Sequence, residues 1–331
     1  MRAAVIGGGS WGSAFARYLG RMKVQTTLWI REEEVLQEAA ESRENKTFLP
    51  GFVFPPSVSF TGRLEEAVSD AEVVFVAVPS AFCRPVYERM AAFLRPAQSV
   101  ISLTKGLEAG SLMRMTDVMA EVFPASRRRR LGALSGPSFA REVAARHPTA
   151  LVLASRHLEW ARRIQHRLSS PTMRIYTSRD IVGVELAGAL KNVIAIAAGI
   201  CDGLDFGLNS RAALITRGLA EMTKLGRSLG ARPETFFGLA GLGDLVLTCT
   251  GGLSRNRWVG VEVARGRSLS AITSGTTMVA EGVLTTLSVR GLSRRQGVEM
   301  PISREVDRIL YYRKNPRQAL AELMSRALRN E

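Results

Sequence analysis

The sequence contains few cysteines, histidines and lysines. Its three cysteines, Cys83, Cys201 and Cys249, are odd in number and far apart, which argues against a disulfide framework and against a zinc site. The three histidines stand in polar stretches beside arginines and show no metal-ligand spacing. We therefore expect no bound metal, and we expect the cysteines to serve packing.

Long apolar segments are also scarce. We find no run that approaches the roughly 20 residues needed to cross a bilayer, although residues 181–200 are apolar and rich in alanine. A signal peptide is not expected, because Met1 and Arg2 lead directly into a strand-like run and then a glycine cluster. These features favour a soluble, cytoplasmic protein that does not insert into a membrane.

Acidic residues are fewer than basic residues. Lysines and arginines number 45 against 30 acidic residues, which gives a net charge of +15 at pH 7. Such a charge favours nucleic acid, a membrane surface or small phosphorylated ligands. No basic stripe is interleaved with aromatics, so we expect a phosphorylated small molecule and no nucleic acid. The densest run, residues 127–130, is expected to be a solvated loop, with a docking patch as the alternative.

The remaining pattern is that of an α/β fold followed by a helical one. Up to about residue 178, apolar β-branched runs alternate with helical stretches, which is typical of a Rossmann-type, doubly wound sheet. Only helical patterns follow. We predict a dinucleotide-binding domain over residues 1–178 and an all-α, substrate-binding and catalytic domain over residues 179–331. The expected strands are 2–6, 24–30, 73–78, 99–103, 131–135, 149–154 and 172–177.

A glycine motif lies between the first expected strand and the first expected helix. Gly7, Gly9 and Gly12 have the G-x-G-x-x-G spacing. In that context the first glycine permits a tight turn, the second lets a pyrophosphate approach the backbone, and the third lets the helix pack on the strand. The motif predicts a dinucleotide site.

The end of the second expected strand bears on which cofactor binds. An NAD-specific site usually has an acidic residue there to bind the ribose hydroxyls. This chain has Arg31, which can pair with a 2′-phosphate, so we expect a preference for NADP(H). The acidic residues at 32–34 keep NAD(H) possible.

Two further turns follow expected strands, where ligands of open α/β sheets bind. Only six residues in the chain are lysines, and one of them, Lys105, lies in the first of these turns. We expect its ammonium to bind substrate or cofactor, with an exposed loop lysine as the alternative. The second turn, residues 135–140, enters a helix whose free amides suit an anion, although a capped helix start is nearly as good an interpretation.

Lys191 is the most informative residue of the second half. It lies within an apolar, alanine-rich helical run, and a buried ammonium without a partner or a role is costly. We therefore predict that Lys191 exchanges a proton with a carbonyl or hydroxyl group. A structural ion pair, for example with Glu185, is the alternative. Asp244, at the end of a glycine-dense segment, is a candidate to orient the lysine, and residues 254–257 offer donors for a phosphate.

Seven motifs in order give the chain a resemblance, over essentially its whole length, to bacterial NAD(P)-dependent glycerol-3-phosphate dehydrogenases. They are Gly-Gly-Gly-Ser-Trp-Gly-Ser-Ala at 7–14, Thr-Lys-Gly-Leu-Glu at 104–108, Ser-Gly-Pro-Ser-Phe-Ala at 135–140, Leu-Lys-Asn-Val-Ile-Ala at 190–195, Ile-Thr-Arg-Gly-Leu-Ala-Glu-Met at 215–222, Gly-Leu-Gly-Asp-Leu-Val-Leu-Thr-Cys-Thr at 241–250 and Ser-Arg-Asn-Arg at 254–257.

The resemblance implies reversible reduction of dihydroxyacetone phosphate to sn-glycerol 3-phosphate for phospholipid synthesis, in a cytoplasmic enzyme. By the same resemblance we expect a homodimer. It implies that Lys191 is the proton donor and acceptor, with Asp244 holding geometry. The implied substrate contacts are Lys105, Gly136, Ser138, Lys191, Asp244, Ser254, Arg255 and Asn256. The implied cofactor contacts, beside Gly7, Gly9 and Gly12 of the loop, are Ser10, Trp11, Arg31, Lys105, Ala140, Arg255, Val279 and Glu281.

Two other functions share some of these features. Dehydrogenases of 3-hydroxy acids or of 6-phosphogluconate also combine a glycine loop with a helical lysine, but they usually place an asparagine several residues beyond the lysine, whereas Asn192 adjoins it here. A protein that binds nucleic acid, or that senses NADP without turnover, would explain only the net positive charge.

Overall fold

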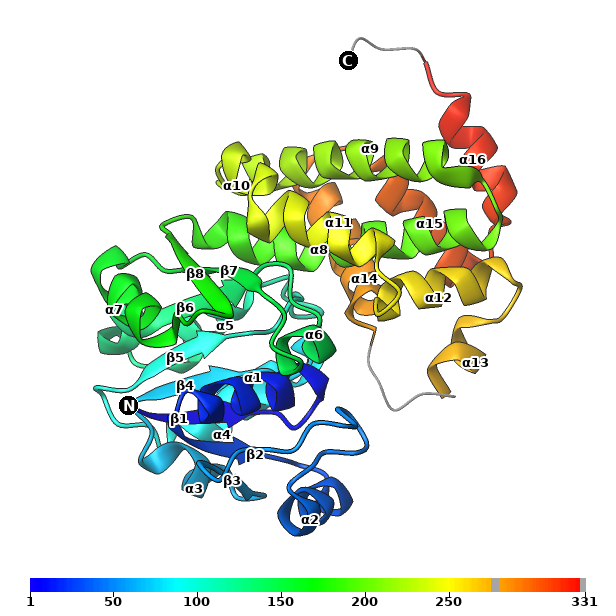
Figure 1. The fold of residues 1–331 in the computed structure, drawn as a ribbon. Coiled ribbons are helices and arrows are strands. Elements are labelled where there is room, and N and C mark those ends of the chain that lie inside the picture. The colour runs from blue at the N-terminus through cyan, green and yellow to red at the C-terminus, as the bar shows by residue number, and fades with distance from the viewer. Residues whose placement is uncertain (275–279, 328–331) are drawn as a thin grey trace. The chain divides into compact units, whose positions relative to one another are not determined.

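The computed structural model of the chain describes residues 1–274 and 280–327 (Figure 1). The chain divides into two compact units, Met1–Glu108 with Met113–Glu185, and Ala109–Leu112 with Leu186–Glu331. The functions assigned above to residues 1–178 and 179–331 stay predictions.

The first unit is built on one eight-stranded sheet with the order β3-β2-β1-β4-β5-β6-β7-β8. Neighbouring strands are parallel except β6 and β7, which are antiparallel. The strands are β1 (Arg2–Ile6), β2 (Gln25–Trp29), β3 (Val58–Thr61), β4 (Val73–Val76), β5 (Ser99–Ser102), β6 (Leu131–Ser135), β7 (Thr149–Ala154) and β8 (Met173–Ser178).

One strand, β3, is missing from the sequence-based expectation. It is a four-residue edge strand of sequence Val-Ser-Phe-Thr, and only Val58 in it is buried. A short, half-polar edge strand lacks the continuous apolar run by which the central strands are found, because only one of its sides pairs with the sheet.

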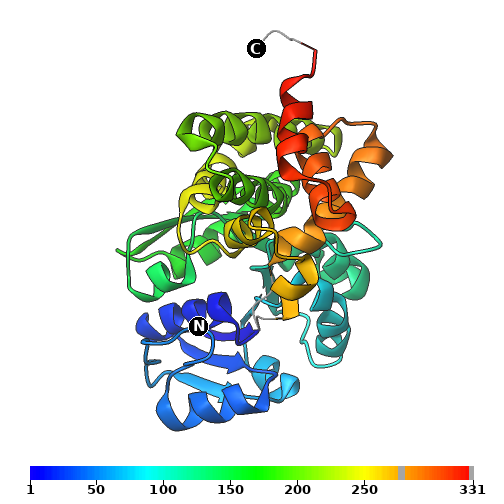
Figure 2. The ribbon, with the colours of Figure 1, turned by 90° about the vertical axis from the view of Figure 1, so that its right-hand side faces the viewer.

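Helices cover both faces of the sheet, as Figures 1 and 2 show. Alternate residues of β1 pack into two separate apolar clusters, Ala3 and Val5 into one and Ala4 and Ile6 into the other. This alternation confirms the predicted doubly wound, Rossmann-type sheet. The helices of this unit are α1 (Ser10–Arg21), α2 (Glu33–Ser42), α3 (Leu64–Ser69), α4 (Cys83–Ala91), α5 (Met115–Val122), α6 (Ala140–Ala144) and α7 (Leu158–Leu168), with the short 3-10 helices η1 (Ser80–Phe82) and η2 (Ala125–Arg130).

The arginine run at 127–130 is only partly the solvated loop that we expected. Arg128, Arg129 and Arg130 are exposed, but Arg127 is only 3% exposed. Its guanidinium donates to the carbonyl oxygens of Leu94, Arg95 and Gln98. Arg127 therefore ties η2 to the loop before β5, and three exposed arginines remain on the surface.

The described part of the second unit contains helices and no strand, which confirms the predicted all-α fold (Figures 1 and 2). Its helices are α8 (Ile181–Gly203, whose first residues belong to the first unit), α9 (Gly207–Ser228), α10 (Pro233–Phe237), the π-helical η3 (Leu239–Gly243), α11 (Asp244–Thr250), α12 (Arg255–Ala264), α13 (Leu269–Ser274), α14 (Glu281–Gln296), α15 (Pro301–Tyr312) and α16 (Pro316–Met324).

The expectation that no apolar segment is long enough to cross a bilayer is wrong for α8. This 23-residue helix is long and apolar enough by length and composition, with a mean hydropathy of 1.7 over its most apolar window. However, 94% of that window is buried inside the protein. A helix that is apolar on all sides is explained by such burial in a protein core.

Two buried carboxyl groups make the stability of the fold depend on pH. Glu221 of α9 accepts hydrogen bonds from the first turn of α15, at Ile302 N (2.6 Å) and Ser303 N (3.2 Å). Glu185 accepts from Thr116 N (2.9 Å) at the start of α5. Burial raises the pKa of each to about 7 from an ordinary value of 4.5.

The raised pKa means that the folded protein binds protons more tightly than the unfolded chain. The resulting stability is fully present below about pH 4.5 and is lost as the pH rises through about 7. We expect the unfolding free energy of the wild type to fall by up to about 3 kcal/mol per group over this range. Glu221→Gln, which cannot ionise, should show about half of this fall in urea unfolding at a series of pH values. An unchanged slope in the variant would contradict the assignment.

Candidate active site

The glycine loop between β1 and α1 has the geometry that its spacing predicts. Gly7 has a φ of +123°, which disfavours any residue with a side chain. A Cβ on Gly12 would lie 1.9 Å from the carbonyl oxygen of Gly7, so only glycine lets α1 approach the strand. A Cβ on Gly9 would meet no atom within 4 Å. The backbone at Gly9 is therefore open, as the approach of a pyrophosphate to the first amides of α1 requires.

Two side chains beside the loop add to this picture. The indole N–H of Trp11 is buried without a hydrogen-bond partner among the described residues. Asn45, fully buried, donates to Gly8 O (2.7 Å) and to Ser13 Oγ (2.9 Å). Asn45 thus buttresses the loop from another segment, and nothing in the local sequence around it indicates this role.

Arg31 follows β2 and is exposed. Its guanidinium pairs with Glu32 Oε1 at 2.6 Å and lies 5.6 Å from the centre of the Phe82 ring. An exposed pair of neighbouring residues contributes little to stability, so the guanidinium can exchange Glu32 for a ligand phosphate at small cost.

The carboxyl ends of β1, β4, β5 and β6 lie at one edge of the sheet, because these neighbours are parallel. Lys105 follows β5, and Gly136 follows β6 with a φ of +129°. The Lys105 ammonium donates to Gly136 O at 2.8 Å and to Ser138 Oγ at 3.2 Å. The structure thus brings together the two predicted turns, and Ala140 follows them as the first residue of α6.

In the second unit, Lys191 of α8 and Asp244 of α11 form a buried pair. Lys191 is 5% exposed and Asp244 is 1% exposed. The ammonium donates to Asp244 Oδ1 (2.8 Å) and to Thr248 Oγ1 (2.7 Å), and the Thr248 hydroxyl donates to Asp244 O (2.6 Å). This contact is what the predicted orienting role of Asp244 requires, and the role itself stays a prediction. Thr248 completes the arrangement from one turn further along α11.

A chain of amides runs beside this pair. Asn256 Nδ2 of α12 donates to Asn192 Oδ1 at 2.9 Å, and Asn256 Oδ1 accepts from Gly282 N of α14 at 2.9 Å. Both asparagines are buried. Asn256 therefore joins α8, α12 and the start of α14, so its position is set by three helices.

The other predicted residues of this unit surround the start of α12 and α14. Ser254 caps α12 by accepting from Arg257 N at 3.2 Å. Arg255 is the first residue of α12, and burial lowers the pKa of its guanidinium. Glu281 is the first residue of α14. Val279, the remaining predicted cofactor contact, lies outside the described residues.

All three cysteines are buried thiols, which fits the packing role expected of them. Cys249 lies on α11 near Lys191, and burial raises the pKa of its thiol to about 12. It therefore stays protonated at neutral pH and is not a nucleophile.

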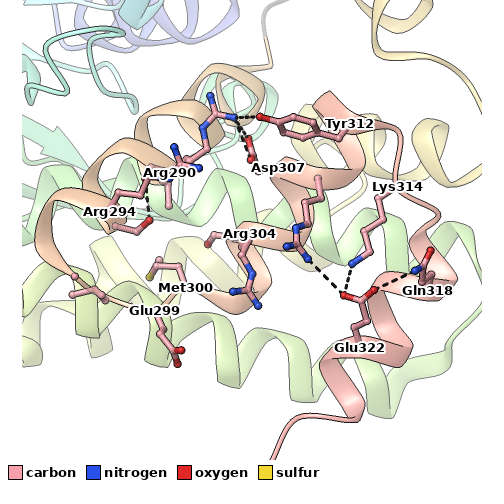
Figure 3. Close-up of a pocket in the computed structure, with 16 residues that line it drawn as sticks. Arg290, Arg294, Glu299, Met300, Arg304, Asp307, Tyr312, Lys314, Gln318 and Glu322 are labelled. Atoms are coloured by element: carbon pink, nitrogen blue, oxygen red, sulfur yellow. Dashed lines mark hydrogen bonds and ion pairs between the residues drawn. The ribbon is translucent and has the colours of Figure 1, made fainter.

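A groove of about 830 Å³ lies elsewhere in the second unit, along α14, α15 and α16 (Figure 3). No predicted site residue lines it. Most of its charged groups pair with one another: Arg290 with Asp307 at 3.2 Å, and Glu322 with Lys314 at 2.6 Å and with Arg308 at 3.6 Å. Figure 3 shows Arg290 beside Asp307 and Lys314 beside Glu322.

The two halves of the chain match the N-terminal and C-terminal domains of one protein family. Residues 2–161 match the NAD-dependent glycerol-3-phosphate dehydrogenase N-terminus, and residues 180–321 match the C-terminus of the same family. The chain belongs to the NAD-dependent glycerol-3-phosphate dehydrogenase family. The resemblance inferred from seven ordered motifs is therefore confirmed.

Bacterial relatives match over their full length. The glycerol-3-phosphate dehydrogenase (NAD(P)+) of Geobacter sulfurreducens is 51% identical over 330 residues, which cover 100% of this chain and 98% of the relative. That of Koribacter versatilis is 52% identical over 327 residues, or 98% and 97% of the two chains. A crystal structure of the glycerol-3-phosphate dehydrogenase from Coxiella burnetii is 38% identical, covers 98% of this chain and 99% of its own, and superposes with a TM-score of 0.93.

Proposed function

We propose that this chain is an NAD(P)-dependent oxidoreductase that reduces dihydroxyacetone phosphate to sn-glycerol 3-phosphate, reversibly. The observation that carries the proposal is the buried Lys191 ammonium held by Asp244, in a chain that matches both halves of the glycerol-3-phosphate dehydrogenase family. A buried, oriented ammonium is a suitable proton donor for a carbonyl oxygen that gains negative charge.

The glycine loop suits the dinucleotide, because Gly9 is open and no side chain caps the first turn of α1. The bound nicotinamide would supply the hydride for the carbonyl carbon. We assign binding of its nucleotide part to Gly7, Gly9, Gly12 and the two residues that follow Gly9. Arg31 would hold the 2′-phosphate, and Ala140 and Glu281 would make further contacts.

Lys191 would hold the substrate carbonyl oxygen and pass a proton to it as it becomes an alkoxide. Asp244 and Thr248 fix the ammonium from the other side, so that the donor does not have to reorganise during the reaction. Asn256, fixed by α8 and α14, would position the triose. In the reverse direction Lys191 would accept the proton from the alcohol.

Cationic side chains and N–H donors are needed to bind the substrate phosphate. Arg255 offers a guanidinium that binds phosphate bidentately, and Ser254 adds a hydroxyl at the start of α12. In the first unit Lys105 would contact substrate and cofactor, together with Gly136 and Ser138. The high net charge of +15 favours the encounter with such anions.

In the cell we propose that the enzyme is cytoplasmic, works mainly in the direction of reduction and supplies glycerol 3-phosphate to phospholipid synthesis. A homodimer is part of the proposal. Sedimentation of the purified protein tests the oligomeric state directly.

The decisive experiment measures initial rates of NADPH oxidation and, separately, NADH oxidation with dihydroxyacetone phosphate. Rapid turnover with at least one cofactor supports the proposal. Turnover only with 3-hydroxy acids or 6-phosphogluconate would show that the chain catalyses another reaction. Binding of NADPH without any turnover would indicate a sensor.

Cofactor choice gives a separate prediction at Arg31. Arg31→Ala should lower kcat/KM for NADPH by about ten- to hundredfold, because it removes charge-assisted hydrogen bonds to the 2′-phosphate. The value for NADH should change less than about twofold, since that cofactor has no such phosphate. Glu32→Gln is the matched control: it removes the competing carboxylate and should improve NADPH use. An equal fall for both cofactors in Arg31→Ala would contradict the assignment.

A further inference from the structure

The loop that carries Lys105 is anchored at both ends. At its start, the Thr104 hydroxyl donates to Val78 O at 2.6 Å, and Thr104 N donates to Ser102 Oγ at 3.2 Å. At its end, Glu108 accepts two hydrogen bonds from Arg84 of α4, from Nε at 2.7 Å and from Nη2 at 2.9 Å. Lys105 lies between these two anchors.

The anchor at Glu108 is stronger than an ordinary surface ion pair. The planar guanidinium meets both carboxylate oxygens, which fixes the orientation of each partner. The Glu108 side chain is only 13% exposed, so solvent screens the pair weakly. The backbone agrees with this placement, because Glu108 N donates to Met113 O at 2.9 Å.

The position of this loop determines where the Lys105 ammonium lies. A lysine side chain is long and flexible, and here its Nζ reaches Gly136 O and Ser138 Oγ, which belong to a different turn. A displaced ammonium would bind the substrate less tightly in the ground state and in the transition state alike, which raises KM and leaves kcat nearly unchanged. Thr104 alone fixes only the start of the loop, so the other end needs its own restraint.

We propose that Arg84 and Glu108 are positioning residues that act on the reaction through Lys105. The inference rests on the proposed function, in which Lys105 binds the phosphorylated substrate. Glu108→Gln keeps the size of the side chain but loses its charge and one acceptor. We expect it to raise the KM for dihydroxyacetone phosphate by roughly tenfold or more while kcat changes less than about threefold.

Glu121→Gln is the matched control. Glu121 accepts from the same guanidinium, Arg84 Nη2, at 2.8 Å, but it lies on α5, outside the loop, and is 53% exposed. Its loss should leave KM unchanged. Glu108→Asp, which keeps the charge, should restore part of the wild-type KM. Equal KM values for the Glu108→Gln and Glu121→Gln variants would overturn the proposal.

A double-mutant cycle tests whether Glu108 works through Lys105. Lys105→Met alone should lower kcat/KM strongly, and adding Glu108→Gln to it should lower kcat/KM by less than about twofold further. Additive losses would show that Glu108 acts independently of Lys105, and would also overturn the proposal.

Hydrogen exchange separates this inference from the proposed function, because it needs no turnover. If the wild type does not reduce dihydroxyacetone phosphate, the proposed function fails, and exchange at the amides of residues 104–108 still decides the positioning role. Faster exchange in Glu108→Gln than in Glu121→Gln and wild type supports an anchored loop. Equal exchange in all three proteins shows that the Arg84–Glu108 pair does not order the loop.

Discussion

Lys191→Ala is expected to lower kcat for dihydroxyacetone phosphate reduction by about a thousandfold or more, while NADPH still binds. In the proposed mechanism the ammonium protonates the developing alkoxide, and general acid catalysis contributes roughly 10²–10⁴-fold. Cofactor binding should survive, because the glycine loop belongs to the first unit. Initial rates, together with NADPH binding followed by fluorescence, check both statements.

The control for this experiment must separate chemistry from folding. Removing Lys191 leaves the Asp244 carboxylate buried without its cation, which can cost about 3–5 kcal/mol of stability. The double variant Lys191→Met with Asp244→Asn contains no unpaired buried charge at this site. It should fold better than Lys191→Ala and remain inactive. A folded double variant that keeps a tenth of the wild-type kcat would refute the role of Lys191.

Gly199→Ala is expected to destabilise the protein by about 3 kcal/mol or more, although alanine is the better helix former. A Cβ at Gly199 of α8 would lie 1.9 Å from the carbonyl oxygen of Arg257 on α12. The contact is reciprocal, because a Cβ at Gly260 would lie 2.1 Å from Ile196 O. Backbone atoms cannot move aside as a flexible side chain can, so α12 must shift. Helix propensity alone predicts that the variant is stabilised by about 1 kcal/mol. The packing clash and helix propensity therefore predict stability changes of opposite sign.

Gly252→Ala provides the matched control for the second prediction. A Cβ at Gly252 would meet no atom within 4 Å, so this variant should stay within about 0.5 kcal/mol of wild type. Denaturant unfolding of the two variants measures the difference. Any folded Gly199→Ala protein should also lose activity, because α12 carries Arg255 and Asn256. Equal stability of the two alanine variants would show that α8 and α12 do not pack as closely as described.

Much of the fold could be predicted from local patterns. Central strands such as β4 are continuous apolar runs, and the glycine loop has a spacing with one physical meaning. The strand that was missed, β3, has a weak local signal because it is short and half polar. Some helix starts also carry a local signal, such as the Asn315 cap followed by Pro316 at the start of α16.

The sequence by itself determined the residue types and their order. The glycine loop, the rare lysines Lys105 and Lys191, and the seven motifs predict a dinucleotide-dependent enzyme of this family, because covalent spacing and side-chain chemistry are local properties. Only the tertiary structure decided which distant groups meet: Asn45 beneath Gly8, Thr248 on Lys191, and Arg84 on Glu108. These partners are separated by tens of residues, and their contacts depend on how helices and strands pack, which no local pattern encodes.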